Sequence, residues 1–303
     1  MPIYKLMSFH VLIIIGAPVR ISLLLACFLS ITPISSSVSA QSPHSPCDSK
    51  TRLDCANLVG EAFDSLDCDC LNQGHTDIEH GKANVVVDSV GWVVGIPRKI
   101  MIWDRRIDNH QVSSKTTSTV STYLSDRRLH DVKLRVNQYD PVGEWKRLIQ
   151  NKRMSPGWKY TAGVLRTAEY TILPGRIFGR DEYNPITNTV SIYSDAPVMG
   201  LAPSAYAFDV HRRASPGTYA TFQSLPLIAM YHETIATKDV IDYTLAKGNF
   251  HSAEVRHILY ARYGTEAGGE VGRFIPGSGT VFEVAGAIGG HSVAGLQSDK
   301  VRR

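Results

Sequence analysis

Residues 184–213 read NPITNTVSIYSDAPVMGLAPSAYAFDVHRR and carry the most informative pattern in the chain. Within them, the segment 187–193 alternates apolar and polar residues, which predicts a strand. Pro197 suits the first turn of a helix, and we expect this helix to continue to about Arg213, before the Pro-Gly pair at 216–217 ends it. The stretch therefore predicts a strand followed at once by a helix.

The rest of the chain has mostly helical patterns. The alternating segment 131–139 is an exception, and we expect a half-buried strand with Val132, Leu134 and Val136 inward and its polar residues, among them Arg135, facing solvent. The element type of 83–103 is ambiguous, and 176–185 is a turn-rich loop. Expected helices are 55–66, 113–124, 141–149, 218–245, which is bent or restarted at Pro226, and 252–263. This order predicts an α+β fold, dominated by helices, with a small sheet.

The first forty residues have the pattern of a cleavable export signal. Two apolar runs, 10–15 and 21–31, are separated by Arg20, and no acidic residue precedes Asp48. Small residues lie one and three places before Gln41, as at a cleavage site. We therefore expect a protein exported to the periplasm, the cell envelope or the medium.

Two alternatives would keep the protein at a membrane. Leu24-Leu25-Ala26-Cys27 matches a lipoprotein box, which would place a lipid on Cys27. The apolar segment would otherwise remain as an uncleaved anchor, because signal peptides and short anchors overlap in composition. Membrane attachment thus stays an open alternative to cleavage.

Four of the five cysteines follow the signal and lie close together. In an oxidising compartment such a cluster predicts two disulfides. A bond between Cys68 and Cys70 would close a very tight ring, so we expect each of them to bond with Cys47 or Cys55. A zinc site is the alternative, although the spacing differs from the paired Cys-x-x-Cys of a zinc ribbon.

The charge of the chain bears on its partners. The signal contains two of the 32 basic residues and none of the 28 acidic ones, so the exported chain is close to neutral. A neutral chain does not favour nucleic acid as a partner. We divide the chain into a signal peptide, a Cys-containing N-terminal segment, a main domain and a Gly/Ala-rich C-terminal tail, at residues 1–40, 41–106, 107–263 and 264–303.

The tail is largely apolar as far as Leu296. Its segment Gly286-Ala287-Ile288-Gly289-Gly290 places small residues four apart, as at close helix contacts. Pro276, Glu283 and His291 argue against a simple membrane span. We expect a tightly packed helix, with a membrane hairpin as the alternative.

Residues 184–213 and a second expected helix, with Tyr231-His232-Glu233-x-x-Ala236-x-x-Asp239, resemble a set of uncharacterised exported bacterial proteins related to gluzincin-type zinc metallopeptidases. The resemblance covers residues 107–270. In that set the first helix carries His-Glu-x-x-His, whose histidines bind zinc and whose glutamate activates the bound water. The resemblance implies a metallopeptidase-like, zincin-like core in the main domain, with Glu233 as the third zinc ligand.

The first helix departs from this pattern at its decisive positions. The two histidine positions fall on Ala202 and Tyr206, and the glutamate position falls on Pro203. Alanine has no donor atom, proline cannot act as a base, and a neutral tyrosine is a poor substitute for imidazole at zinc. Asp209 matches an aspartate of the pattern but cannot rebuild the site alone. We therefore expect no catalytic residue and no metal at this site.

A compensating metal site is an alternative. His232 and Asp239 are seven residues apart and share a helix face. A rebuilt site would gather donors from facing helices, namely His211, Asp209, His232, Glu233 and Asp239. Zinc is an expected cofactor only if these residues converge; otherwise we expect none.

Three functions follow from these patterns. The first is an exported, non-catalytic pseudo-metallopeptidase that binds or scaffolds an unidentified protein partner through the cleft between helices 198–211 and 225–245. The second is an active metal-dependent hydrolase with a rebuilt site around His232 and Glu233. The third is a structural envelope or membrane-associated protein whose Gly-rich tail makes the contact. We favour the first, with membrane contact through the N-terminal segment or the tail as the alternative.

Overall fold

The computed structural model describes residues 76–222, 228–248, 250–275 and 277–301, which all belong to one compact unit of the chain. The expected signal, the helix at 55–66 and the disulfides of the four cysteines lie outside the described residues. Helices dominate the described part, around one small mixed sheet. The predicted helix-dominated α+β class is confirmed.

A four-stranded sheet has the order β1-β2-β4-β3. Strands β1, β2 and β4 are parallel, and β3 pairs antiparallel with β4. The strands are β1 (Ile78–His80), β2 (Lys133–Val136), β3 (Glu182–Asn184) and β4 (Thr189–Ile192). Both alternating segments of the sequence therefore form strands, at the centre of the sheet.

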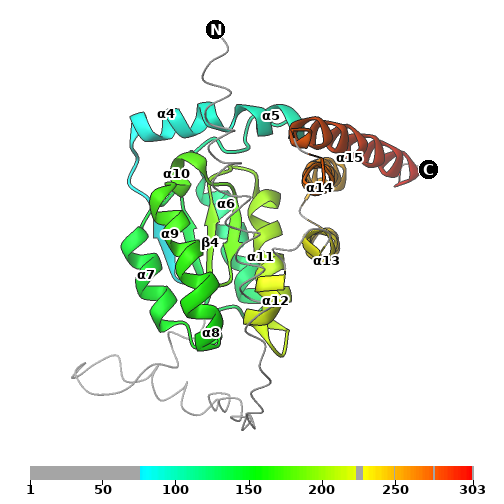
Figure 1. Ribbon diagram of the computed structural model, residues 1–303. Coiled ribbons are helices and arrows are strands. Elements are labelled where there is room, and N and C mark those ends of the chain that lie inside the picture. Colours follow the sequence, from blue (N-terminus) through cyan, green and yellow to red (C-terminus); the bar gives the residue numbers. More distant parts are fainter. Residues whose placement is uncertain (1–75, 223–227, 249, 276, 302–303) are drawn as a thin grey trace, which may run out of the picture. The chain divides into compact units, whose positions relative to one another are not determined.

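One face of the sheet is apolar and joins the main core. Leu134 pairs in register with Val190, and Val136 pairs with Ile192. These buried side chains pack with residues of two helices, α6 (Ser114–Asp126) and α11 (Pro197–His211). Figure 1 shows α7 and α9 on one side of the sheet, and α6 and α11 on the other.

The prediction that Arg135 faces solvent is wrong. Its side chain is 1% exposed, because α7 (Pro141–Gln150) covers the polar face of the sheet. The guanidinium donates to Glu144 on α7, to Glu79 on β1 and, at 3.3 Å, to Asp140. A buried charge persists only where such partners surround it. The polar position Arg135 of the alternating segment therefore faces buried ion pairs and not solvent.

The segments that connect the strands are helical. The ambiguous segment 83–103 forms α4 (Val85–Val94) and α5 (Ile96–Ile102), and the expected loop at 176–185 contains a short helix and β3. Between α7 and β3 the chain forms α8 (Pro156–Trp158), the π-helical turn η1 (Lys159–Gly163), α9 (Val164–Ile172) and α10 (Gly175–Phe178).

Four further helices complete the described chain: α12 (Pro216–Phe222), α13 (Ile228–Lys247), α14 (Ser252–Gly272) and α15 (Gly279–Val301). Within the expected helix at 218–245, the structure describes α12 and α13, on either side of residues 223–227. The expected helix at 252–263 continues as α14, so the boundary drawn before residue 264 falls within a helix. None of the helices in the described ranges is long and apolar enough to cross a membrane.

The C-terminal helices pack in sequence. α13 packs against α11, α14 packs against α13, and α15 packs against α14. Figure 1 shows α13 and α14 end-on, one above the other, with α15 beyond α14. α11 is therefore enclosed between the sheet and α13, and it positions the residues of the candidate site.

Candidate functional site

α11 carries the three positions that the resemblance aligns with His-Glu-x-x-His, and it is buried on nearly all sides. It begins at Pro197, directly after β4, and packs against α6, β4 and α13. An apolar residue set around the whole circumference is typical of a core helix. Pro203 lies inside it and lacks the N–H that would bond the carbonyl of Met199. Packing on all sides compensates for this loss, and the helix continues to His211.

The residues at the motif positions do not fit a zinc ion. Ala202 is 1% exposed and has no donor atom, and Pro203 offers neither a ligand nor a base. Tyr206 is 8% exposed, and burial raises the pKa of its phenol well above the usual range. The phenol therefore stays neutral and is a poor zinc ligand.

Aromatic side chains meet between α11 and α13. The ring of His232 lies with its centroid 5.5 Å from that of Tyr206 and 4.3 Å from that of Tyr219, and both contacts are edge-to-face. Tyr206 also meets Tyr183 of β3 at 5.4 Å. Such geometry is favourable for aromatic pairs. Ring packing thus occupies the region where the resemblance implies metal chemistry.

Asp209 is the centre of a polar network beside these rings. It accepts a hydrogen bond from Arg213 Nη2 at 2.6 Å and another from the hydroxyl of Tyr219 on α12. Arg213 also lies over the Tyr219 ring, 4.2 Å from its centroid. Burial and the hydrogen bond to Asp209 raise the pKa of Tyr219. The carboxylate of Asp209 is therefore engaged in holding α11 to α12.

His232 is the most isolated polar group of the site. It is 2% exposed, and neither ring nitrogen has a hydrogen-bond partner within the described part of the chain. Its Nδ1 lies 3.5 Å from Asp209 Oδ2, a distance that gives electrostatic attraction without a well-formed hydrogen bond. Burial lowers the pKa of His232, and the attraction to Asp209 opposes this effect. We therefore expect a neutral imidazole at pH 7.

Glu233, the implied third zinc ligand, faces a different helix. Its two carboxylate oxygens accept from Arg262 Nη1 at 2.6 Å and from Arg262 Nη2 at 2.9 Å. Arg262 lies on α14. A bidentate pair of this kind is directional and strong. The carboxylate thus joins α13 to α14, and its neighbour His232 makes the contact with α11.

The remaining candidate donors lie in two other places. Asp239 accepts from Arg127 Nη2 at 2.7 Å and from the hydroxyl of Tyr123, so it holds α13 to α6. His211 Nε2 lies 3.0 Å from Asn188 Oδ1. Burial and the charge of Arg153 lower the pKa of His211 to about 4, and Asp131 opposes them.

The five donors of the hypothetical rebuilt site therefore belong to separate networks. Only His232 and Asp209 approach each other among them. In the described ranges, no three His, Cys, Asp or Glu side chains are placed to hold a metal ion. Arg213, Tyr219 and Arg262 engage these donors and were not singled out from the sequence. Only the spacing of Asp209 and Arg213, four apart in the helix expected from the sequence, offered a signal.

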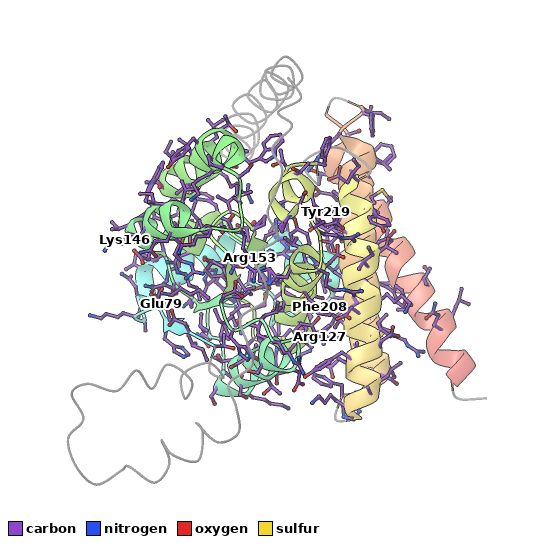
Figure 2. All side chains as sticks on the ribbon, turned by 90° about the horizontal axis from the view of Figure 1, so that it is seen from below. Glu79, Arg127, Lys146, Arg153, Phe208 and Tyr219 are labelled. Atoms are coloured by element: carbon purple, nitrogen blue, oxygen red, sulfur yellow. The ribbon has the colours of Figure 1, made fainter. Side chains whose placement is uncertain are left out.

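A surface depression of about 320 Å³ lies beside the Asp209 network. It is lined by Arg213, Ala214, Ser215, Thr218, Tyr219 and Phe222. Figure 2 shows Tyr219 close to α13. The depression therefore meets the network at Arg213 and Tyr219, on the α12 side of the aromatic cluster.

A second polar cluster lies where β2 and β4 end. The side chain of Asn137, which follows β2, donates to the carbonyl of His110 at 2.9 Å, and its Oδ1 lies 3.0 Å from His110 Nδ1. Both residues have left-handed backbones, with φ of 50° and 56°. Gly91 of α4 packs directly on His110, where a Cβ would be too close. α4 therefore covers this cluster, whose hydrogen bonds join the residue after β2 to the segment that contains His110.

Comparison with known proteins adds no relative. No protein-family model, curated protein or solved structure matches this chain.

Proposed function

We propose that this protein is an exported, non-catalytic binding or scaffolding protein on a metallopeptidase-like frame that has lost its zinc site. The observation that supports this proposal most strongly is that none of the residues at the implied zinc-site positions is available to bind a metal. Ala202 and Pro203 have no donor, Tyr206 packs against the ring of His232, and Glu233 is paired with Arg262. The strand–helix order of β4 and α11, and the packing of α13 on α11, support the frame.

The first experiment measures metal and activity together. The purified chain should contain substoichiometric zinc and should not cleave casein, because the motif positions offer neither ligands nor a base. Stoichiometric zinc, with cleavage that a chelator abolishes, would contradict the proposal and favour a hydrolase rebuilt around His232 and Glu233.

A restoration experiment tests the frame itself. Ala202→His, Pro203→Glu and Tyr206→His together should recover zinc binding if α11 occupies the place of the motif helix. Because Arg262 holds the carboxylate of Glu233, adding Arg262→Met should tighten this binding, and adding Glu233→Gln should abolish it. Absence of zinc binding in a folded triple variant, with and without Arg262→Met, would reject the metallopeptidase-like alignment.

A specific observation favours a structural role as the second candidate function. α15 exposes large apolar side chains along its length, among them Val281, Ile288 and Leu296 at 68%, 62% and 69%. A continuous apolar face on a helix commonly marks an interaction site. A contact of the Gly-rich tail with another molecule would use this face.

A further inference from the structure

α15 has one face against α14 and an opposite face that is exposed. A Cβ on Gly286 or Gly290 would overlap backbone oxygens of α14, so these glycines mark the packed face. The exposed face consists of Val281, Val284, Ala285, Ile288, Gly289, Ser292, Val293, Gly295 and Leu296. No charged side chain lies among these exposed positions of the described helix. The face is therefore an uncharged stripe of large and small residues.

The stripe is complementary to itself in the reverse direction. About the point between residues 288 and 289, the symmetric pairs are Val281 with Leu296, Val284 with Val293, Ala285 with Ser292, and Ile288 with Gly289. Large residues meet large ones in the two outer pairs, and small residues meet in the third. At the centre Ile288 faces Gly289, where nothing lies within 4 Å of an added Cβ. A two-fold contact requires such self-complementarity.

A second copy of the chain fits the stripe better than a lipid surface does. From Val281 to Leu296 the helix rises about 22 Å, which is less than the hydrocarbon core of a bilayer. The described side chains of the stripe also include no lysine or arginine that would attract anionic headgroups. Lipid binding would not account for the symmetric order of large and small residues.

The exposed area is compatible with a weak dimer. The five large side chains of the stripe are 42–69% exposed: Val281, Val284, Ile288, Val293 and Leu296. Covering them on two copies removes on the order of 1,000 Å² from solvent, which is near the lower limit for a specific interface. We therefore expect the contact to dissociate on dilution.

We propose that α15 pairs in antiparallel orientation with α15 of a second copy, about a two-fold axis between residues 288 and 289. Ile288 of each copy enters the space above Gly289 of the other. The proposal rests on the structural role proposed above for the Gly-rich tail. It identifies a second copy of the chain as the molecule that this face contacts. It does not depend on the zinc positions, so the two proposals fail in different measurements: metal content for one, oligomeric state for the other.

Sedimentation of the full chain over a dilution series tests the pairing. The wild type should pass from dimer to monomer, and Ile288→Glu should weaken the dimer at least about tenfold, because two carboxylates would meet near the axis. Val86→Glu is the matched control, since Val86 is an equally apolar residue on α4 that is 73% exposed. This control should leave the dimer unchanged.

A charge pair tests the orientation. Ala285→Glu alone should weaken the dimer, and adding Ser292→Lys should restore it, because these positions face each other only in the antiparallel arrangement. In a parallel dimer Glu would meet Glu, and the second substitution would not help. Gly289→Leu should weaken the dimer by filling the space that Ile288 enters. Circular dichroism and urea unfolding of each variant establish that it folds.

Three results would overturn the proposal. One is a wild-type chain that stays monomeric at all concentrations. Another is a dimer that survives Ile288→Glu but is lost with Val86→Glu, which would place the contact on α4. The third is binding of the monomer to vesicles of phosphatidylcholine and phosphatidylglycerol that Ile288→Glu abolishes, which would identify the occupant as lipid.

Discussion

Two helix pairs in this fold are held together by opposite means. Between α11 and α13, rings fill the contact, with His232 against Tyr206 and Tyr219. Between α14 and α15, the backbones touch: a Cβ on Gly264 would overlap the carbonyl oxygen of Gly286, and the reverse also holds. The first contact depends on which side chains are present and the second on their absence. Substitutions in the first contact therefore change which side chains meet, whereas Gly264 and Gly286 leave no room for any side chain in the second.

The two pairs are also connected. Glu233 on α13 and Arg262 on α14 form a bidentate ion pair with side chains 22% and 9% exposed. The carboxylate that the resemblance assigns to zinc thus stabilises the contact between the ring-filled pair and the glycine pair. The carboxylate of Glu233 is chemically suited to bind a metal, but in this fold it is paired with Arg262.

The largest effect is expected at the glycine contact. Gly286→Leu would force a side chain into the carbonyl of Gly264 and separate α14 from α15. Overlap with backbone cannot be relieved by a rotamer change, so we expect a loss of about 4 kcal/mol or more in the free energy of unfolding. Urea unfolding followed by circular dichroism measures it. Unchanged stability would show that the helices do not touch as described.

The next effect is a pH dependence of stability that comes from His211, at the end of α11. Burial lowers the pKa of His211 to about 4, whereas the unfolded residue titrates near 6.5. The unfolded state therefore binds the proton first, and stability is lost as pH falls from about 6.5 to about 4, by about 3 kcal/mol.

His211→Gln should remove this part of the pH dependence, since glutamine can donate to Asn188 without titrating. Urea unfolding at pH 7, 6, 5 and 4 compares the variant with the wild type. His80→Gln is the control, because His80 is exposed on β1 and should keep the wild-type profile. If the free energy of unfolding falls equally with pH in the wild type and in His211→Gln, the loss of stability does not come from His211.

A smaller effect is expected where the two pairs join. Glu233→Ala leaves the nearly buried Arg262 without its carboxylate, so we expect a loss of about 2 kcal/mol in stability. Casein cleavage should remain absent, as in the wild type. The matched control is Asp242→Ala, which removes an exposed pair with Lys238 on the same helix and should leave stability close to that of the wild type. Similar losses for both variants would mean that Glu233 has no special structural role.

The smallest effect has the opposite sign. Gly295 lies on the exposed side of α15, and nothing lies within 4 Å of a Cβ added there. Gly295→Ala should stabilise the monomer by about 0.5–1 kcal/mol, because alanine favours the helix over the unfolded chain. Thermal unfolding at low protein concentration measures this gain. A loss of stability would indicate that both faces of α15 are closely packed.

The sequence predicted much of the local structure. Proline and glycine positions and apolar spacing indicated α6, α7 and α11, and alternation indicated β2 and β4 with their apolar face. These features depend on residues that are neighbours along one element. The helical nature of 83–103 was left open, because apolar runs fit several element types.

For the candidate site, the sequence alone established that Ala202, Pro203 and Tyr206 lack the groups that zinc chemistry requires, since that follows from side-chain composition. Where the other donors point was decided by tertiary packing. Arg262 holds Glu233, Tyr219 holds Asp209, and Arg135 lies buried beneath α7. Each of these pairs joins different elements, and spacing along a chain does not specify which helix will cover a polar face.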